Sequence, residues 1–86
     1  MNKKFSIVRA KIDINKLINN IKEYSVVSLT NPYLFMNKDT IDELILTVGY
    51  SPDGLSGSQS NYMCGYFQGH KVFCDNTLSF GEVEIR

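Results

Sequence analysis

The chain has 86 residues, with nine basic and nine acidic side chains and a formal net charge of +0. One small domain is expected at this length, and a composition of 43% hydrophobic and 21% charged residues is that of a globular rather than a disordered chain. The balanced charge argues against general nucleic-acid binding and against binding to membrane surfaces.

The N-terminal sequence also argues against a membrane protein. Lys3 and Lys4 are not followed by an apolar run of about 7–15 residues, so no signal peptide is expected. No apolar stretch approaches the roughly 20 residues that cross a bilayer. We therefore expect an intracellular protein, whose two cysteines are free thiols.

Hydrophobic periodicity predicts the elements of the first third of the chain. Residues 4–10 alternate as a strand does. A helix is expected next, because four aliphatic residues recur at i, i+3, i+4 and i+7 and share one stripe: Ile14, Leu17, Ile18 and Ile21. Asp13 is placed to cap it, since a carboxylate accepts hydrogen bonds from free backbone N–H groups. Residues 25–29 are β-branched and predict a strand or an extended connector.

A strand and a second helix are expected after the turn at Pro32. The apolar run YLFM at residues 33–36 predicts a buried strand. Asn37 stands where a helix N-cap belongs, and the helix then covers about residues 38–46. Gly49 is a natural stop for it, and its buried stripe consists of Ile41, Leu44 and Ile45.

The last third predicts a loop, a hairpin and a final strand. Residues 50–61 are rich in Gly and Ser and are expected to form a long exposed loop. Strands at 62–67 and 70–75 flank a turn at Gln68-Gly69. Residues 82–86 alternate as a half-buried strand, which we place at a sheet edge. The fold expected is α+β, with two helices packed on a small antiparallel sheet with a C-terminal hairpin, in a single domain of residues 1–86.

The loop at residues 50–61 is the candidate contact site. Apolar anchors among adaptable polar side chains are the mixture that contact surfaces favour, and here these are Tyr50, Leu55, Ser56, Gln59 and Tyr62. A slack connector without a contact role is the alternative interpretation.

The histidine and the cysteines do not predict a metal site. Cys64, His70, Cys74 and Asp75 lack the Cys-x₂₋₄-Cys spacing of structural zinc sites, so we expect neither metal nor cofactor. With a two-residue turn at 68–69 the thiols point to opposite faces of the hairpin. With a three-residue turn Cys64 lies opposite Cys74, where a disulfide becomes feasible. Two free, mostly buried thiols are expected with either turn.

No catalytic constellation is evident, so we expect that the protein is not an enzyme. The one histidine lies in a turn, without an orienting third group. Asp39 and Asp42 are explained by the helix dipole, and there is no phosphate-binding loop. The aromatic residues are assigned to core packing rather than to base stacking, because no basic groove accompanies them.

The segment NPYLFMNKDTIDELI, at residues 31–45, resembles major capsid proteins of tailed phages, in which an apolar strand is followed by Met-Asn and a helix. Those proteins then carry the pattern Gly-x-x-Val-x-x-Asp/Asn-x-x-Leu, and Gly69, Val72, Asp75 and Leu78 fall in this register. The resemblance covers residues 31–86. It implies a reduced subdomain, because 86 residues cannot hold the spine helix, extended loop and N-terminal arm of the family.

We therefore expect a small non-enzymatic phage or prophage protein that acts through protein–protein contacts as a virion or assembly component. The alternative is a phage inhibitor that binds a host enzyme or defence complex. The expected partner is a protein or further copies of the chain, and the expected location is the host cytoplasm or the virion.

Overall fold

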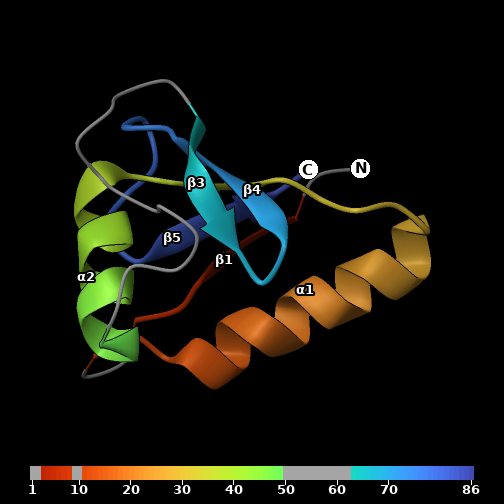
Figure 1. Cartoon of the computed structure of the whole chain (residues 1–86), viewed down its shortest axis with the longest axis horizontal. Helices are drawn as coiled ribbons and strands as arrows, with labels where there is room; N and C mark the ends of the chain where they lie inside the picture. The colour runs from red at the N-terminus through yellow and green to blue at the C-terminus, as the bar shows by residue number, and fades with distance from the viewer. Residues whose placement is uncertain (1–2, 9–10, 50–62) are drawn as a thin grey trace.

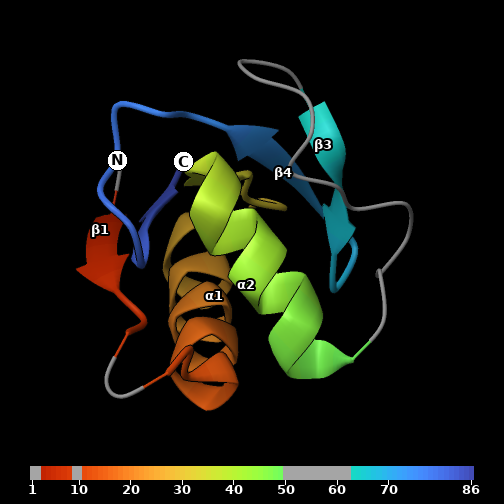
Figure 2. The ribbon, with the colours of Figure 1, turned by 90° about the vertical axis from the view of Figure 1, so that its left-hand side faces the viewer.

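The structure is a computed structural model that describes residues 3–8, 11–49 and 63–86. Its elements are β1 (Lys3–Ser6), α1 (Ile14–Ser28), β2 (Leu34–Met36), α2 (Lys38–Val48), β3 (Met63–Phe67), β4 (His70–Cys74) and β5 (Glu82–Ile85) (Figure 1). The strands form one five-stranded sheet, and both helices lie on the same side of it (Figure 2). The expected α+β class is confirmed.

The order of the strands corrects two parts of the predicted sheet. The order is β1-β5-β2-β4-β3, and β2 runs parallel to β4 while the other pairs are antiparallel. The sheet is therefore mixed rather than purely antiparallel. A parallel pair needs a long crossover between its two strands, and the chain between β2 and β4, which includes α2 and β3, provides it. The hairpin β3–β4 is followed by β5, which lies between β1 and β2 and not at an edge.

Strand β1 is shorter than the strand expected at residues 4–10. It pairs with β5 so that Phe5 lies beside Val83. After Ser6 the ladder ends, and the N–H of Ile7 donates instead to the carbonyl of Gly81 at 2.8 Å. Residues 9 and 10 lie outside the described part of the chain.

Helix α1 begins as predicted and ends later. The Asp13 carboxylate accepts a hydrogen bond from the Lys16 N–H at 3.0 Å. The helix then continues through residues 25–28, so the strand or connector predicted there is wrong. Tyr24 is buried one turn beyond Ile21 and extends the same apolar stripe. This packing overrides the β preference of two exposed valines, because such preferences are weak and depend on context.

Helix α2 follows its prediction closely. The Asn37 side chain accepts from the Thr40 N–H at 2.7 Å, and the helix ends at Gly49, whose φ is 84°. Ile41 and Leu44 are fully buried. They pack with α1 and the inner face of the sheet in one core, to which the described part of the chain contributes fifteen buried residues, including Leu17, Ile21, Val72 and Val83.

The β3–β4 hairpin has the predicted two-residue turn, with Phe67 paired to His70. Gln68 and Gly69 both have positive φ, of 55° and 79°, as a tight turn of this hand requires.

The two cysteines nevertheless lie on the same side of the hairpin. The register shifts between Met63 and Gly65, and this β-bulge turns Cys64 toward the core, where Cys74 also lies. The opposite-face placement inferred from a two-residue turn is therefore wrong, because strict alternation does not hold across a bulge. Neither cysteine is in a disulfide, and both are buried, as expected.

Candidate functional site

The contact loop predicted from the sequence lies outside the described residues. This applies to all five of its candidate side chains, Tyr50, Leu55, Ser56, Gln59 and Tyr62. The candidate site is therefore sought among the surfaces that the described residues form.

One face of the sheet carries no described helix. Successive side chains of a strand point to opposite faces, and in β2, β4 and β5 one set is buried against the helices. The other set, together with the flanking residues, forms what we call the open face: Tyr33, Phe35, Lys71, Phe73, Asp75, Glu82, Glu84 and Arg86.

Three aromatic rings form the centre of the open face. The Phe35 and Phe73 rings stack with centroids 5.0 Å apart and planes 15° apart, and the Tyr33 ring lies 5.4 Å from that of Phe73. Tyr33 is 43% exposed, whereas Phe35 and Phe73 are half-buried. Core packing, the interpretation of the aromatic residues from the sequence, therefore does not hold for these three.

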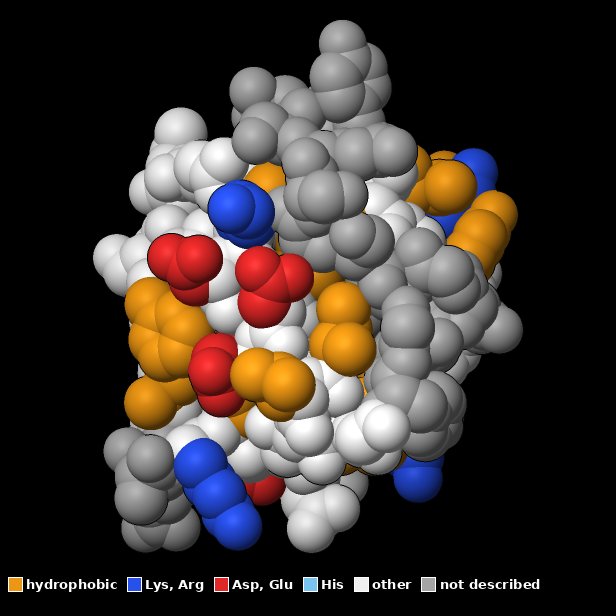
Figure 3. All heavy atoms as spheres, turned by 60° about the vertical axis from the view of Figure 1, so that its left-hand side comes forward, with side chains coloured by type: hydrophobic (Ala, Val, Ile, Leu, Met, Phe, Trp, Pro, Cys, Tyr) orange, Lys and Arg blue, Asp and Glu red, His pale blue; other side chains and the backbone are white. Residues whose placement is uncertain are grey.

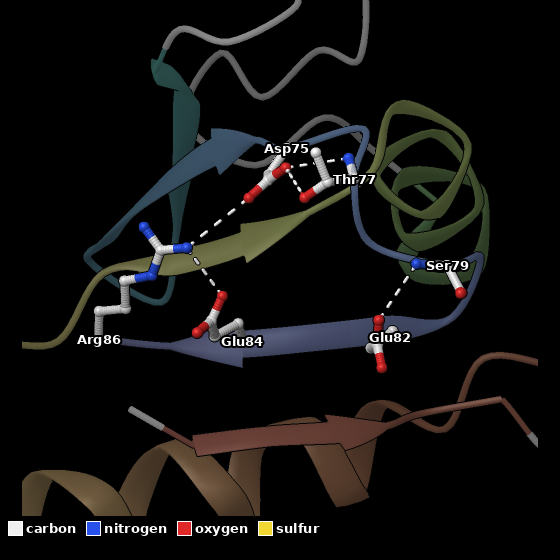
Figure 4. Close-up of polar contacts among 6 residues, drawn as sticks. All are labelled: Asp75, Thr77, Ser79, Glu82, Glu84 and Arg86. Carbon is white, nitrogen blue, oxygen red and sulfur yellow. Dashed lines mark hydrogen bonds and ion pairs between the residues drawn. The ribbon is translucent and has the colours of Figure 1, made fainter. Parts of the chain in front are cut away.

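Arg86 covers part of this aromatic centre. Its guanidinium carbon lies 3.9 Å from the centroid of the Phe35 ring, a cation–π distance. Its Nη2 lies 2.8 Å from Glu84 Oε1 and 3.7 Å from Asp75 Oδ2 (Figure 4). These contacts connect the end of β5 to the end of β4 across β2.

Two charged groups of the open face, Asp75 and Arg86, have pKa values that favour their ionised forms. Hydrogen bonds from the Thr77 hydroxyl and backbone N–H, at 2.5 and 3.0 Å, lower the pKa of Asp75, and Arg86 lowers it further. The hydrogen bond to Glu84 raises the pKa of Arg86. Neither group is suited to proton transfer near neutral pH, because a general acid or base needs a pKa close to the working pH.

The thiols and the histidine do not form a reactive site either. Burial, followed by the nearby Cys74, raises the pKa of the Cys64 thiol, which disfavours the reactive thiolate. His70 Nδ1 lies 3.1 Å from the Pro32 carbonyl oxygen. Among the described residues, no three His, Cys, Asp or Glu side chains gather as a metal site would require.

Two shallow hollows are too small for most ligands. One, of about 230 Å³, is lined by Ile7, Val8, Asp13 and Lys16. The other, of about 180 Å³, lies between α1 and the β3–β4 turn and is lined by Ile18, Ile21, Lys22, Gln68 and His70. Pockets for small molecules are typically about 300–1,000 Å³.

The exposed side of α2 is the second surface of note. Figure 3 shows acidic and hydrophobic side chains interspersed there. Exposed Leu46 lies on this helix with Asp39, Asp42 and Glu43. The acidic residue of the first turn is explained by the helix dipole, as expected from the sequence. Among the described residues, this surface has no ring or ion-pair contacts like those of the open face.

Comparison of the chain with models of known protein families, with curated protein sequences and with solved structures gives no match. In the described part of the chain, neither helix has the length and apolar character needed to cross a membrane. The function of the chain is therefore inferred from its own residues and their contacts.

The open face was not predicted from the sequence, because its aromatic residues lie in a run that is typical of a buried strand. Tyr33 and Phe35 belong to the continuous apolar run YLFM, which is typical of a strand buried on both faces. A signal was present in β4 and β5, where Lys71 and Asp75, or Glu84 and Arg86, occupy alternate positions. Charges at alternate positions indicate a face in contact with solvent.

Proposed function

We propose that the chain is a small non-enzymatic protein of a phage or prophage that acts through protein–protein contacts, as a virion or assembly component. The open face is the contact surface in this proposal. The observation that supports it most is the ordered aromatic centre of Tyr33, Phe35 and Phe73, uncovered by either helix and bordered by charged side chains. Aromatic residues and arginine are enriched in protein interfaces.

The chemistry of the open face favours contact over catalysis. Its carboxylates are bound by Arg86 and by the Thr77 hydroxyl, and the pKa of Asp75 is lowered, away from neutrality. The charges of this face include both signs, which suits a protein surface better than a polyanionic backbone. The phage assignment itself is supported by the resemblance of residues 31–86 to capsid proteins.

The test is association of the chain with phage particles. Particles are purified from the strain that encodes the chain, and the chain is quantified in them by mass spectrometry. We expect it at a constant ratio to the major particle proteins, and we expect Tyr33→Ser to lower that ratio. Leu46→Ser is the control, because it also replaces a large exposed hydrophobic side chain by serine, and Leu46 is 71% exposed on α2, away from the open face.

Two results would contradict the proposal. Absence of the chain from particles, together with a stable complex with one host enzyme, would favour the inhibitor instead. Equal incorporation of Tyr33→Ser and the wild type, with both variants folded, would remove the open face from the contact.

A further inference from the structure

We infer that the partner of the open face is a second copy of the same chain, packed face to face about a two-fold axis that runs across the strands through Phe73. This inference rests on the proposed function in taking the open face as the contact surface. It goes further by naming the occupant and its orientation.

Strand β4 carries the pattern on which the inference depends. The outward side chains of β4 and of the residue that follows it are, in order, a cation, an aromatic ring and an anion: Lys71, Phe73 and Asp75. Lys71 and Asp75 are four residues apart, which is about 13 Å along an extended strand. Phe73 lies midway between them. A strand with this pattern is complementary to its own copy when the two run in opposite directions.

The two-fold arrangement follows from this order. In a two-fold interface, residue i contacts residue j of the other copy and j contacts i. An axis through Phe73 across the strands places Lys71 of each copy against Asp75 of the other, and Arg86 against Glu82, with the aromatic centres in contact. It also brings Glu84, which is level with Phe35, toward its own copy, but Glu84 is ion-paired with Arg86. An axis along the strands places Lys71 against Lys71 and Asp75 against Asp75, and like charges in contact are unfavourable.

The charges involved retain bonding capacity. Within the described residues Lys71 forms no ion pair, and its ammonium lies 5.7 Å from the Tyr33 ring centroid. The second carboxylate oxygen of Asp75 is 3.7 Å from Arg86, longer than a hydrogen bond. This oxygen is therefore ion-paired with Arg86 but not hydrogen-bonded to it, so it can still accept a hydrogen bond from an incoming lysine.

The balance of charge disfavours single-stranded nucleic acid as the occupant. Stacking on aromatic side chains would suit bases, but such sites also need a positively charged groove along the backbone. On this side of the sheet the cations Lys4, Lys71 and Arg86 are offset by the anions Asp75, Glu82 and Glu84. Neither helix of the described chain adds a basic rim to this face.

The dimer is expected to be weak because the face is small. Five strands about 4.8 Å apart give a width of about 24 Å. Interfaces that bury less than about 1,200 Å² in total are typical of transient contacts. Self-association should therefore be measured by sedimentation equilibrium at chain concentrations from about 10 µM to about 1 mM. We expect the mass to rise from 9.8 kDa toward twice that value.

Exchange of charge tests the orientation. Lys71→Glu alone and Asp75→Lys alone should each weaken self-association by about tenfold or more, because each creates two repulsive pairs. An equimolar mixture of the two variants should dimerise again, since the residues at positions 71 and 75 of one variant then face opposite charges on the other. Lys38→Glu, an exposed lysine at the start of α2, is the control and should dimerise as the wild type does.

Cross-linking of the unaltered chain gives an independent test that does not depend on variants that fold. A zero-length carbodiimide should join Lys71 to Asp75 in the covalent dimer. In a mixture of ¹⁴N- and ¹⁵N-labelled chains, this cross-link should contain both labels. The span of about 13 Å within one strand is too long for the same bond inside one chain.

Several outcomes would overturn the inference. These are a monomer over the whole concentration range, a dimer that Lys71→Glu leaves unchanged, or a mixture of variants that stays monomeric. Binding of a single-stranded oligonucleotide by a monomeric chain, lost in Lys71→Glu, would identify nucleic acid as the occupant instead. A monomer that still enters phage particles would refute the dimer and leave the proposed function standing.

Discussion

Thr40 and Gly81 join α2 to the loop before β5. Thr40 is fully buried, and its hydroxyl donates to Asn37 Oδ1 at 2.7 Å and accepts from the Gly81 N–H at 2.8 Å. Gly81 has a φ of 81°, and a Cβ on it would overlap the side chain of Val8. A polar group buried here is tolerated because it is hydrogen-bonded. The close approach of Val8 also requires a residue without a side chain at position 81.

Gly81→Ala should therefore destabilise the fold more than Gly49→Ala. Both glycines have similar positive φ, of 81° and 84°, so each alanine suffers backbone strain of about 1 kcal/mol. A Cβ on Gly49 meets nothing within 4 Å, whereas Gly81→Ala adds an overlap expected to cost about 1–3 kcal/mol. Urea unfolding measures both. Equal losses of stability would show that the overlap with Val8 is relieved at no cost.

Asp75 predicts a specific dependence of stability on pH. The pKa of Asp75 is lower in the folded chain, because the ionised carboxylate accepts from Thr77. Its contribution to stability is complete above the ordinary pKa of about 3.9 and is lost as the pH falls through the lowered, folded-state pKa.

Asp75→Asn should thus lower the free energy of unfolding at about pH 6, and by progressively less as the pH falls below the ordinary pKa toward the lowered, folded-state pKa. Asp42→Asn, at an exposed position of α2, is the control. Thermal unfolding at a series of pH values gives the measurement. A loss of stability that is the same at every pH would mean that the charge of Asp75 does not contribute.

The helices are specified by their caps and by the side that each buries. Asp13 and Asn37 begin α1 and α2 by accepting backbone N–H groups, and Leu29 and Gly49, both in left-handed conformation, end them. Such caps act within one turn, so they are visible in the sequence. The length of α1 was not visible, because Tyr24 extends the buried stripe only when the sheet lies beneath it.

Leu44 and Leu46 allow the buried and exposed sides of α2 to be compared by the same substitution. Leu44 is fully buried and Leu46 is 71% exposed. Leu44→Ala should lower the free energy of unfolding by roughly 2–5 kcal/mol, through lost burial and the cavity that remains. Leu46→Ala should change it by less than about 0.5 kcal/mol, as at other surface sites. Similar values for the two variants in urea unfolding would mean that the buried side of α2 is misassigned.

At the scale of the whole molecule, the sheet order decides which surfaces exist. Strands β5, β2 and β4 are interior, whereas β1 and β3 are the edges. The central position of β2 places Phe35 between Glu84 of β5 and Phe73 of β4. The aromatic centre of the open face is therefore a consequence of strand order, since these residues are far apart in the chain.

Hydrogen exchange can test this order. The backbone of an interior strand is paired on both sides, whereas an edge strand leaves alternate N–H groups free. We expect protection at consecutive amides of β5, including Val83 and Glu84, and alternating protection in β1. Exchange by nuclear magnetic resonance resolves single amides. Alternating protection in β5 would restore the edge position expected from the sequence.

The sequence by itself determined the local features of this protein. The two caps, the stripes of α1 and α2, the tight turn at Gln68-Gly69 and the final strand were all predicted, because each depends on neighbours within a few residues. Of the residues buried on the two helices, Leu17, Ile21, Ile41 and Leu44 followed from the same periodicity, whereas Tyr24 and Thr40 did not.

Only the tertiary structure decided the parallel pairing of β2 with β4, the interior place of β5 and the side of the sheet that stays open. These depend on contacts between distant residues, such as Lys4 with Glu84 and Phe35 with Phe73. A short apolar run has the same composition whether one or both of its faces are covered. Tyr33 and Phe35 became surface residues because both helices pack on the opposite side of the sheet.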